Sequence, residues 1–132
     1  MNIDKKYYQE INENLTNTIQ DTNISAPNKK VGKVRDAYFL NDKVVMISTD
    51  RQSAFDRVLA AIPYKGAVLN SVSAWWFKKT EHLFPNHLIS TPDPNVSIVE
   101  KCTVFPVEFV VRGYITGTVS YTHLRAHETE AY

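Results

Sequence analysis

The stretch VGKVRDAYFLNDKVVMIS, residues 31–48, predicts the central element of this chain. It contains two runs rich in β-branched and aromatic residues, 31–40 and 43–48, which are separated by Asn41-Asp42. Two such runs joined by a short polar pair are typical of a β-hairpin. The second run is apolar almost throughout, so we expect that strand to be buried.

Helical patterns lie on both sides of this hairpin. Apolar residues recur at spacings of three and four over residues 5–20 and again over residues 67–84, which predicts two helices. The second is expected to be the core helix, with Trp75 and Trp76 packed at the core and at its rim. The apolar residues expected to attach the first helix to the domain are Tyr8, Ile11 and Leu15.

The remaining segments read as short strands and loops. Strands are predicted at residues 58–62, 87–91, 97–104 and 107–114, with breaks at residues 92–94 and at Pro106. The polar residues 49–56 are expected to form a loop. Mostly strands with one central helix indicate an α+β fold, a mainly antiparallel sheet with a packed helix.

Composition narrows the classes of function. The chain has 132 residues, and 15 Lys and Arg against 14 Asp and Glu leave a formal net charge of +1. This is the length of one domain, and it provides no basic field for nucleic acid. No apolar run approaches the roughly 20 residues of a membrane span. The single Cys102 allows no internal disulfide, so we expect a cytoplasmic protein with neither nucleic acid nor membrane as partner.

Glycines beside cations are the first candidate sites. Gly32 precedes Lys33, Gly66 follows Lys65, and Gly113 follows Arg112. Glycine lets a backbone N–H approach a ligand closely and the cation adds charge, so such pairs suit a phosphate or carboxylate. Each pair is equally typical of a surface turn. The pair at 32–33 is the stronger, because a glycine weakens a strand unless close approach is required.

Two polar segments follow predicted strands. Residues 49–56, TDRQSAFD, place two carboxylates, an arginine and two hydroxyls directly after a buried strand, where binding residues are often held. A capped polar loop explains them equally well. Arg112 follows an apolar strand and could hold a carboxylate or phosphate, or it could pair with Glu108. His123 and His127 lack a third metal ligand, so no metal site is predicted.

Several motifs become recognisable together. They are GKVRD at 32–36, TDRQSAFD at 49–56, KG at 65–66, PNHL at 85–88 and PVEFVVRGYITGT at 106–118. Their order and spacing resemble the phosphoribosylaminoimidazole-succinocarboxamide synthase (SAICAR synthetase) family.

The resemblance implies a nucleotide-binding lobe similar to the small lobe of kinases. The 32–36 hairpin would lie over ATP, and Lys33 and Arg112 would be the catalytic cations. The residues implied for ATP are Gly32, Lys33, Val34, Arg35 and, at a hinge, Glu100, Lys101 and Cys102. The residues implied for the substrates are Asp50, Ser53, Asp56, Lys65, Arg112, Gly113, Thr116 and Thr118.

The resemblance also implies the reaction. ATP would activate the carboxylate of carboxyaminoimidazole ribotide as an acyl phosphate, and the amine of L-aspartate would displace phosphate to form an amide. Mg²⁺ would bridge the ATP phosphates, with its ligands expected in the family's carboxyl-terminal part. This is the chemistry of an ATP-dependent carbon–nitrogen ligase of purine biosynthesis.

The resemblance does not extend over the whole chain. Residues 1–30 are expected to form a helix and a loop, 31–118 a truncated ATP-binding lobe, and 119–132 a non-native tail unlike the family's continuation. We expect such a fragment to be inactive alone and to expose apolar surface. The alternative is a standalone nucleotide- or anion-binding module without catalysis.

Overall fold

A computed structural model describes residues 5–26, 28–55, 57–107 and 111. The chain divides into two compact units, Met1–Cys102 and Thr103–Tyr132, and the described helices and strands all lie in the first. These elements are α1 (Lys5–Glu13), β1 (Lys29–Val31), β2 (Arg35–Phe39), β3 (Lys43–Ser48), β4 (Arg51–Ala54), β5 (Arg57–Ala61), α2 (Lys65–Thr80), β6 (Leu88–Asp93) and β7 (Val96–Glu100).

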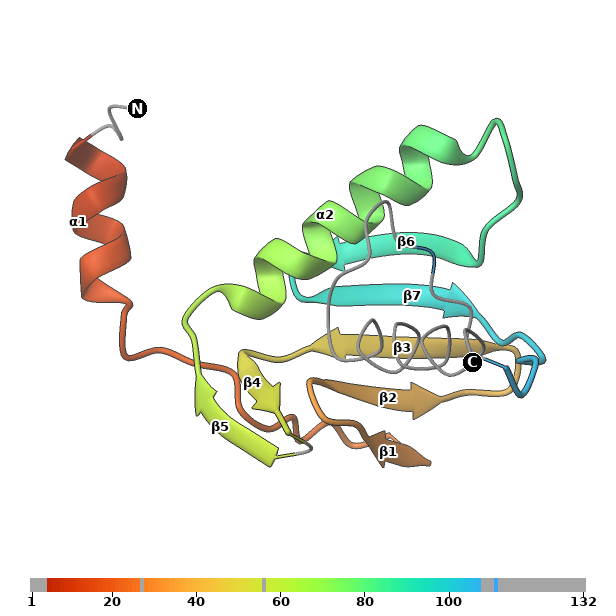
Figure 1. Cartoon of the computed structure of the whole chain (residues 1–132), viewed down its shortest axis with the longest axis horizontal. Coiled ribbons are helices and arrows are strands. Elements are labelled where there is room, and N and C mark those ends of the chain that lie inside the picture. Colours follow the sequence, from red (N-terminus) through yellow and green to blue (C-terminus); the bar gives the residue numbers. More distant parts are fainter. Residues whose placement is uncertain (1–4, 27, 56, 108–110, 112–132) are drawn as a thin grey trace, which may run out of the picture. The chain divides into compact units, whose positions relative to one another are not determined.

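Five strands form one antiparallel sheet in the order β1-β2-β3-β7-β6 (Figure 1). The predicted hairpin is confirmed as β2 and β3, in which Arg35 pairs with Ser48 and Phe39 with Val44. Its second strand lies at the centre of the sheet, because β7 pairs with the other edge of β3. The expected α+β fold is therefore correct.

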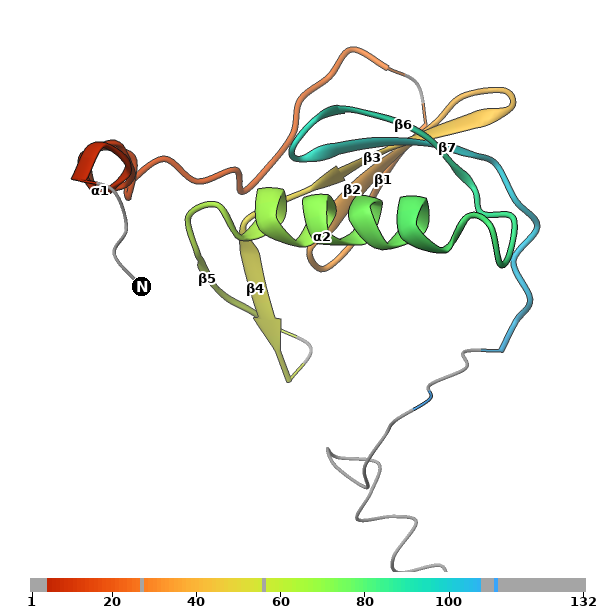
Figure 2. The same cartoon turned by 90° about the horizontal axis from the view of Figure 1, so that it is seen from above.

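The two faces of the sheet are covered by different segments. Helix α2 packs against β3, β7 and β6, and Figure 2 shows it on one side of the sheet. Because side chains alternate along a strand, Asp36 and Tyr38 of β2 point to the opposite face. There they meet Thr22, from the segment that connects α1 with β1.

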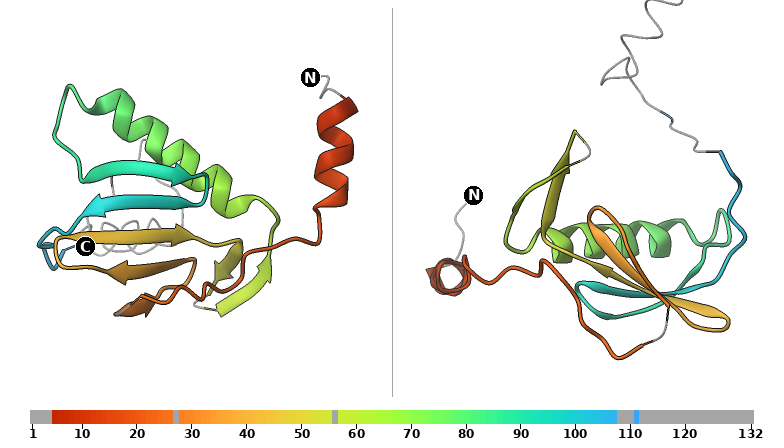
Figure 3. Two further views of the ribbon diagram at one scale, coloured as in Figure 1. Left: turned by 180° about the vertical axis from the view of Figure 1, so that it is seen from behind. Right: turned by 90° about the horizontal axis from the view of Figure 1, so that it is seen from below.

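Views from behind and from below show the same arrangement (Figure 3). The segment that follows α1 passes beside the start of β4 before it reaches β1. Hydrogen bonds join these parts of the chain, from the Asp50 N–H to the Ile19 carbonyl at 2.8 Å and from Arg51 to the Gln20 carbonyl at 2.5 Å. The segment is thus tied to the sheet through its backbone.

Helix α1 ends earlier than predicted, at Glu13 instead of near residue 20. The Asn14 side chain donates to the Glu10 carbonyl at 2.9 Å, and the Asn17 side chain donates to Asn14 Oδ1 at 2.8 Å. Such local side-chain bonds compete with the helical backbone. The expected attachment through the apolar face is also wrong, since Tyr8, Ile11 and Leu15 are 62%, 39% and 51% exposed.

Three strand predictions need correction. The strand expected at 97–104 is β7, which ends at Glu100. Residues 51–54 were expected in a loop, yet they form β4, which pairs with β5 in a separate two-stranded ribbon. Strand β6 was expected to end before residue 92, yet it continues through Pro92 to Asp93. Because β6 is an edge strand, proline removes no hydrogen bond needed by a second neighbour.

The core helix was predicted at residues 67–84 and is found as α2, but it is less buried than expected. Its buried residues are Gly66 and Asn70, whereas Trp75 and Trp76 are 55% and 56% exposed. Apolar residues lie on more than one side of this helix, and a single sheet can cover only one stripe of it. The prediction that Trp75 and Trp76 pack at the core and at its rim is therefore wrong for the core, since each residue is more than half exposed.

The predicted strand at 107–114 and the tail at 119–132 fall largely or wholly outside the described residues. Residues 107 and 111, which are described, belong to no strand. Within the described ranges, no helix has the length and apolar content needed to cross a membrane.

Candidate functional site

The first glycine–cation pair lies in a tight turn between β1 and β2. The Gly32 N–H donates to the Arg35 carbonyl at 2.7 Å. A Cβ atom added at Gly32 would lie 2.8 Å from that same oxygen, closer than side-chain carbons normally approach. Glycine is therefore required for the turn to close. Below, residues 32–36 are called the 32–36 loop.

The carbonyl groups of this loop point into the protein. Arg51 donates from Nη2 to the Gly32 oxygen at 3.0 Å and from Nε to the Lys33 oxygen at 3.2 Å. The Val34 oxygen accepts from Thr49, both from its N–H at 3.0 Å and from Oγ1 at 2.9 Å. The loop thus has a fixed orientation, set by two residues that follow β3.

A buried ionic network lies beneath the loop. The fully buried Asp36 accepts from Arg51 Nη2 at 2.6 Å and from the Thr22 hydroxyl at 2.7 Å, and its Oδ2 is 3.2 Å from Lys29 Nζ. Burial alone would raise the pKa of Asp36, but the hydrogen bonds from Arg51, Thr22 and Lys29 outweigh it, so the pKa lies below its usual value. Asp36 is therefore a carboxylate at neutral pH.

Lys29 extends this network to the surface. Its Nζ donates to Asp21 at 2.8 Å and also to the Thr22 carbonyl. The hydrogen bond with Asp21 is the main cause that raises the pKa of Lys29, and the same bond lowers the pKa of Asp21. The network joins β1, β2 and the preceding segment.

Lys65 and Gly66, the second glycine–cation pair, lie at the start of α2 and pack tightly. A Cβ atom at Gly66 would lie 2.3 Å from the Ser48 carbonyl oxygen and 2.6 Å from Asn95 Nδ2. The Gly66 N–H donates to Asp50 Oδ1 at 2.9 Å, and Lys65 Nζ donates to the Arg51 carbonyl at 3.0 Å. This glycine is explained by close packing of the helix on β3.

Asp50, expected to bind substrate, is 3% exposed and uses both carboxylate oxygens on backbone groups. Oδ1 accepts from Gly66, and Oδ2 accepts from the Ile19 N–H at 2.8 Å. Ser53 is half-buried in β4. Substrate contact by Asp50 and Ser53 stays a prediction, and in this structure Asp50 joins the N-terminal segment to α2.

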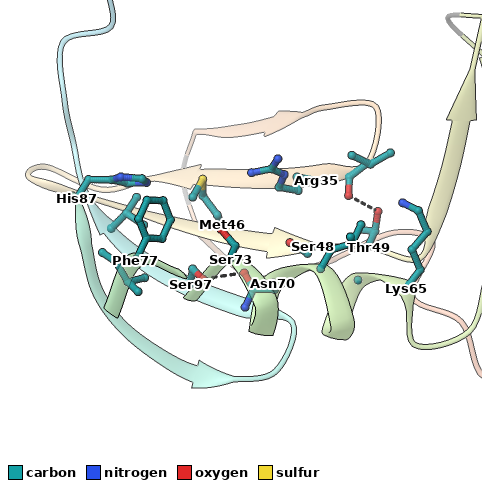
Figure 4. A pocket seen from close by; sticks show the side chains of 15 residues that line it. Arg35, Met46, Ser48, Thr49, Lys65, Asn70, Ser73, Phe77, His87 and Ser97 are labelled. Carbon is teal, nitrogen blue, oxygen red and sulfur yellow. Dashed lines mark hydrogen bonds between the residues drawn. The ribbon is translucent and has the colours of Figure 1, made fainter. Parts of the chain in front are cut away.

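A pocket of about 140 Å³ lies between the sheet and α2 (Figure 4). Arg35, Thr49 and Lys65 lie at one end, and Phe77 and His87 at the other. Its lining also includes Val34, Met46 and Gly66. The structure thus brings four expected site residues, Val34, Arg35, Lys65 and Gly66 of the 65–66 motif, to one pocket next to the 32–36 loop.

The expected hinge lies at the other end of the sheet. Glu100 pairs with Lys43, whereas the 32–36 loop lies beside Ser48. The N–H groups of Glu100 and Lys101 already donate to the carbonyls of His87 and Asp42 at 2.8 and 3.0 Å. Adenine contacts at this end would therefore use carbonyl groups or the backbone at Cys102, whose side chain is exposed.

Other expected residues lie outside the described residues: Asp56, Arg112, Gly113, Thr116 and Thr118. Among the residues that are described, no three His, Cys, Asp or Glu side chains gather in a way that could hold a metal ion.

Sequence reasoning did not select Arg51 and Asp36 as site residues. Arg51 was noted only as part of the 49–56 segment, and Asp36 only as the end of the 32–36 loop. One feature of the sequence could have identified both residues. Each is a charged residue within or next to a predicted buried strand, and a buried charge needs a partner. The partners lie 15 to 31 residues apart, which spacing alone does not reveal.

Together, these features define an α+β protein with a polar loop and pocket between an antiparallel sheet and one helix. The sequence profile of SAICAR synthetase matches residues 28–131. The chain therefore belongs to the SAICAR synthetase family, and the resemblance carried by its motifs is confirmed. The matched range includes residues 119–131, and the non-native origin of that segment stays a prediction.

Curated relatives agree with this assignment. The chain is 60% identical over 102 residues to the phosphoribosylaminoimidazole-succinocarboxamide synthase of Legionella pneumophila (strain Lens), covering 77% of this chain and 33% of the relative. It is 55% identical over 113 residues to the chloroplastic enzyme of Arabidopsis thaliana, covering 82% and 28%. The chain thus spans about a third of the length of the curated relatives it matches.

Solved structures show the same fold. The SAICAR synthase from Saccharomyces cerevisiae, complexed with SAICAR, matches with a TM-score of 0.73 and 29% identity, over 81% of this chain and 44% of that one. A type-2 SAICAR synthetase in complex with ADP matches with a TM-score of 0.55 and 30% identity, over 60% of this chain and 35% of that one.

Proposed function

We propose that this chain is the ATP-binding, amino-terminal part of a phosphoribosylaminoimidazole-succinocarboxamide synthase, a ligase of purine biosynthesis. The complete enzyme would couple ATP hydrolysis to amide formation between carboxyaminoimidazole ribotide and L-aspartate. The observation that carries the proposal is the 32–36 loop, a glycine turn with inward carbonyls, in a family that includes a solved structure in complex with ADP.

ATP would lie along the sheet. Its phosphates would meet the 32–36 loop and Lys33, and its adenine would meet the backbone at 100–102. These two regions lie at opposite ends of β3, whose six residues span about 17 Å at roughly 3.4 Å per residue. That separation suits an extended nucleotide with a base at one end and phosphates at the other. Val34 and Arg35, which line the pocket, would lie beside the phosphates.

The proposed chemistry has two steps. A carboxylate oxygen of the ribotide attacks the γ-phosphorus of ATP, ADP leaves, and an acyl phosphate forms. The amine of aspartate then attacks the acyl carbon, phosphate leaves, and the amine gives up a proton. Both steps concentrate negative charge on phosphoryl oxygens, so fixed cations lower the barrier. Lys33 and Arg112 are the cations that we assign to this role.

The remaining expected residues belong to the substrate side of the proposal. They are Asp50, Ser53, Asp56, Lys65, Gly113, Thr116 and Thr118. Mg²⁺ would offset phosphate charge in the complete enzyme. The described residues provide no cluster of acidic ligands, and we propose that the ligands of Mg²⁺ belong to the family's carboxyl-terminal part.

We further propose that the 132-residue chain binds MgATP without ligase turnover, in a cytoplasmic setting. The chain spans about a third of the length of its curated relatives. The residues that we propose as site residues do not include a complete set of metal ligands. Binding without turnover is also expected of a standalone module. Adding the remaining part of a related enzyme to this chain distinguishes a ligase fragment from a standalone module, because only a ligase fragment would gain activity from it.

A titration tests the proposal. MgATP should raise the melting temperature of the chain, and Lys33→Met should reduce this rise because a phosphate contact is lost. Lys30→Met, at an exposed position of β1, removes the same charge outside the loop and serves as the control. No stabilisation of the wild-type chain by MgATP would refute nucleotide binding. Formation of the succinocarboxamide product by the purified chain would refute its inactivity.

A further inference from the structure

Arg51, together with Thr49, fixes the orientation of the 32–36 loop. It is 8% exposed, and a guanidinium has five N–H donors. Four hydrogen bonds are made by these donors. They run from Nε to the Lys33 carbonyl, from Nη1 to the Gln20 carbonyl, and from Nη2 to the Gly32 carbonyl and Asp36 Oδ1. A side chain so buried and so occupied is not itself placed to bind a phosphate.

The consequence for the loop follows from peptide geometry. In a trans peptide, the carbonyl of one residue and the N–H of the next point in opposite directions, and the described peptides include no cis bond. Arg51 holds the carbonyls of residues 32 and 33, and Thr49 holds that of residue 34. The N–H groups of Lys33 and Val34 are therefore directed away from Arg51, and the N–H group of Arg35 is directed away from Thr49.

Consecutive N–H groups that point the same way form an anion-binding concavity. We propose that Arg51 is a positioning residue, which orients the peptide groups of the 32–36 loop so that their N–H groups face the nucleotide phosphates. The inference rests on the proposed function, because it assigns the loop a phosphate ligand. It also couples the loop to the preceding segment, since the same guanidinium holds Gln20.

The fork shape of arginine is essential to this role. Its planar donors reach two successive carbonyls and a carboxylate at once, whereas a lysine ammonium is a compact charge on a flexible stem. Arg51→Lys keeps a cation opposite Asp36 but cannot reproduce all four bonds. The substitution therefore separates the charge of Arg51 from its hold on the carbonyls.

A matched control disturbs the same network without removing a hydrogen bond to the carbonyls of residues 32–34. The Thr22 hydroxyl bonds Asp36 at 2.7 Å and lies 2.8 Å from the Tyr38 hydroxyl. Thr22→Val removes these contacts and leaves the bonds from Arg51 to residues 32 and 33. Both variants are expected to lose global stability because each loses buried hydrogen bonds, so a difference between them reports on the loop carbonyls.

The experiment uses the full 132-residue chain, with two measurements on wild type, Arg51→Lys and Thr22→Val. Calorimetric titration measures MgATP affinity, and hydrogen exchange measures protection of the amides at 33–35 without ligand. We expect Arg51→Lys to lose about tenfold or more in affinity, which corresponds to about 1.4 kcal/mol, and to change exchange at 33–35. Thr22→Val should stay within about twofold of wild type in affinity, because the loop bonds to Arg51 remain.

The outcomes are distinguishable. If the wild-type chain binds no MgATP, the proposed function fails, and exchange at 33–35 still decides whether Arg51 holds the loop. Equal exchange in Arg51→Lys and wild type overturns the inference, as does an equal loss of affinity in both variants. If Arg51→Lys does not fold, NMR of the wild type decides. The Arg51 Nε–H should stay bonded to Lys33 while MgATP shifts the amides of 33–35, and movement of Arg51 onto the nucleotide overturns the inference.

Discussion

Replacing Gly66 by alanine is expected to destabilise the chain, although alanine is the better helix former. Gly66 is the second residue of α2, and its added Cβ would lie 2.3 Å from the Ser48 oxygen, 2.8 Å from the Ser48 carbonyl carbon and 2.6 Å from Asn95 Nδ2. Cβ atoms essentially never approach other atoms within 3.0 Å. The start of α2 must therefore move away from β3 by at least 0.7 Å, the difference between 3.0 and 2.3 Å.

The cost can be worked from the contacts. Overpacking of this size typically costs about 1–3 kcal/mol. Moving the helix also weakens the bond from the Gly66 N–H to the Asp50 carboxylate, and a hydrogen bond to a charged group is worth about 1.5–3 kcal/mol. Alanine gains at most about 1 kcal/mol of helix propensity over glycine. The expected loss is therefore about 2–5 kcal/mol, a large part of the roughly 5–15 kcal/mol stability of a domain.

Urea unfolding followed by far-ultraviolet circular dichroism measures this loss. Ser71→Ala, at an exposed position of α2, is the control, and its effect should stay within about 0.5 kcal/mol. The competing idea is that Gly66 serves close approach of an anion instead of packing. It predicts that Gly66→Ala is as stable as wild type or more stable, and that result would refute the packing argument.

Further predictions concern the network, the loop and the tail. The pKa of Asp36 lies below its ordinary 3.8, so its contribution to stability is full above that value and is lost as pH falls through the lowered pKa. Asp36→Asn should therefore flatten the pH dependence of unfolding free energy below about pH 5, and an unchanged slope would contradict this. Gly32→Val should weaken MgATP binding more than Val34→Ile does, because its Cβ collides with the Arg35 oxygen at 2.8 Å; equal losses in titration would show a purely structural loop. Deleting residues 119–132, in which polar side chains outnumber apolar ones, should leave the melting temperature unchanged, and a clear decrease would show that they contribute to the fold.

The elements with strong periodicity were predictable from the sequence. The β2–β3 hairpin and helix α2 were expected within a few residues of their observed bounds, because an apolar run after a polar turn and a helical spacing are local signals. Strand β4 was missed because its sequence, RQSA, has neither apolar alternation nor β-branched residues. Pairing with β5 defines it, and pairing is not a local property.

Burial was less predictable than secondary structure. The apolar pattern of α2 led to the expectation of a core helix, yet the residues of α2 that are buried are Gly66 and Asn70. Asn70 accepts from the Ser97 hydroxyl at 2.7 Å and donates to the Pro94 carbonyl at 3.0 Å. A polar residue with this many partners is well satisfied when buried. The sequence alone does not show which side of an apolar helix the sheet will cover.

The glycine–cation pairs show what a short sequence motif can predict and what it cannot. Gly32-Lys33 and Lys65-Gly66 are similar in sequence, but the space around each glycine differs. At Gly66 an added Cβ collides with Ser48 of β3 and with Asn95, which lies between β6 and β7, whereas at Gly32 it collides only within its own turn. Lys65 donates to the Arg51 carbonyl inside the protein. The first pair therefore remains the better candidate for a phosphate-binding site, whereas close packing explains the glycine of the second pair.

The polar residues that follow β3 have a role that their composition did not reveal. Thr49 holds the carbonyl of Val34, Asp50 holds the N–H groups of residues 19 and 66, and Arg51 holds the carbonyls of residues 20, 32 and 33. One tripeptide thus fixes the loop, the start of α2 and the N-terminal segment. Because these three parts share adjacent anchors, from the end of β3 to the first residue of β4, a change at residues 49–51 should not affect one part alone. The carboxylate and guanidinium that suggest a ligand site in the sequence act here to assemble the site around the loop.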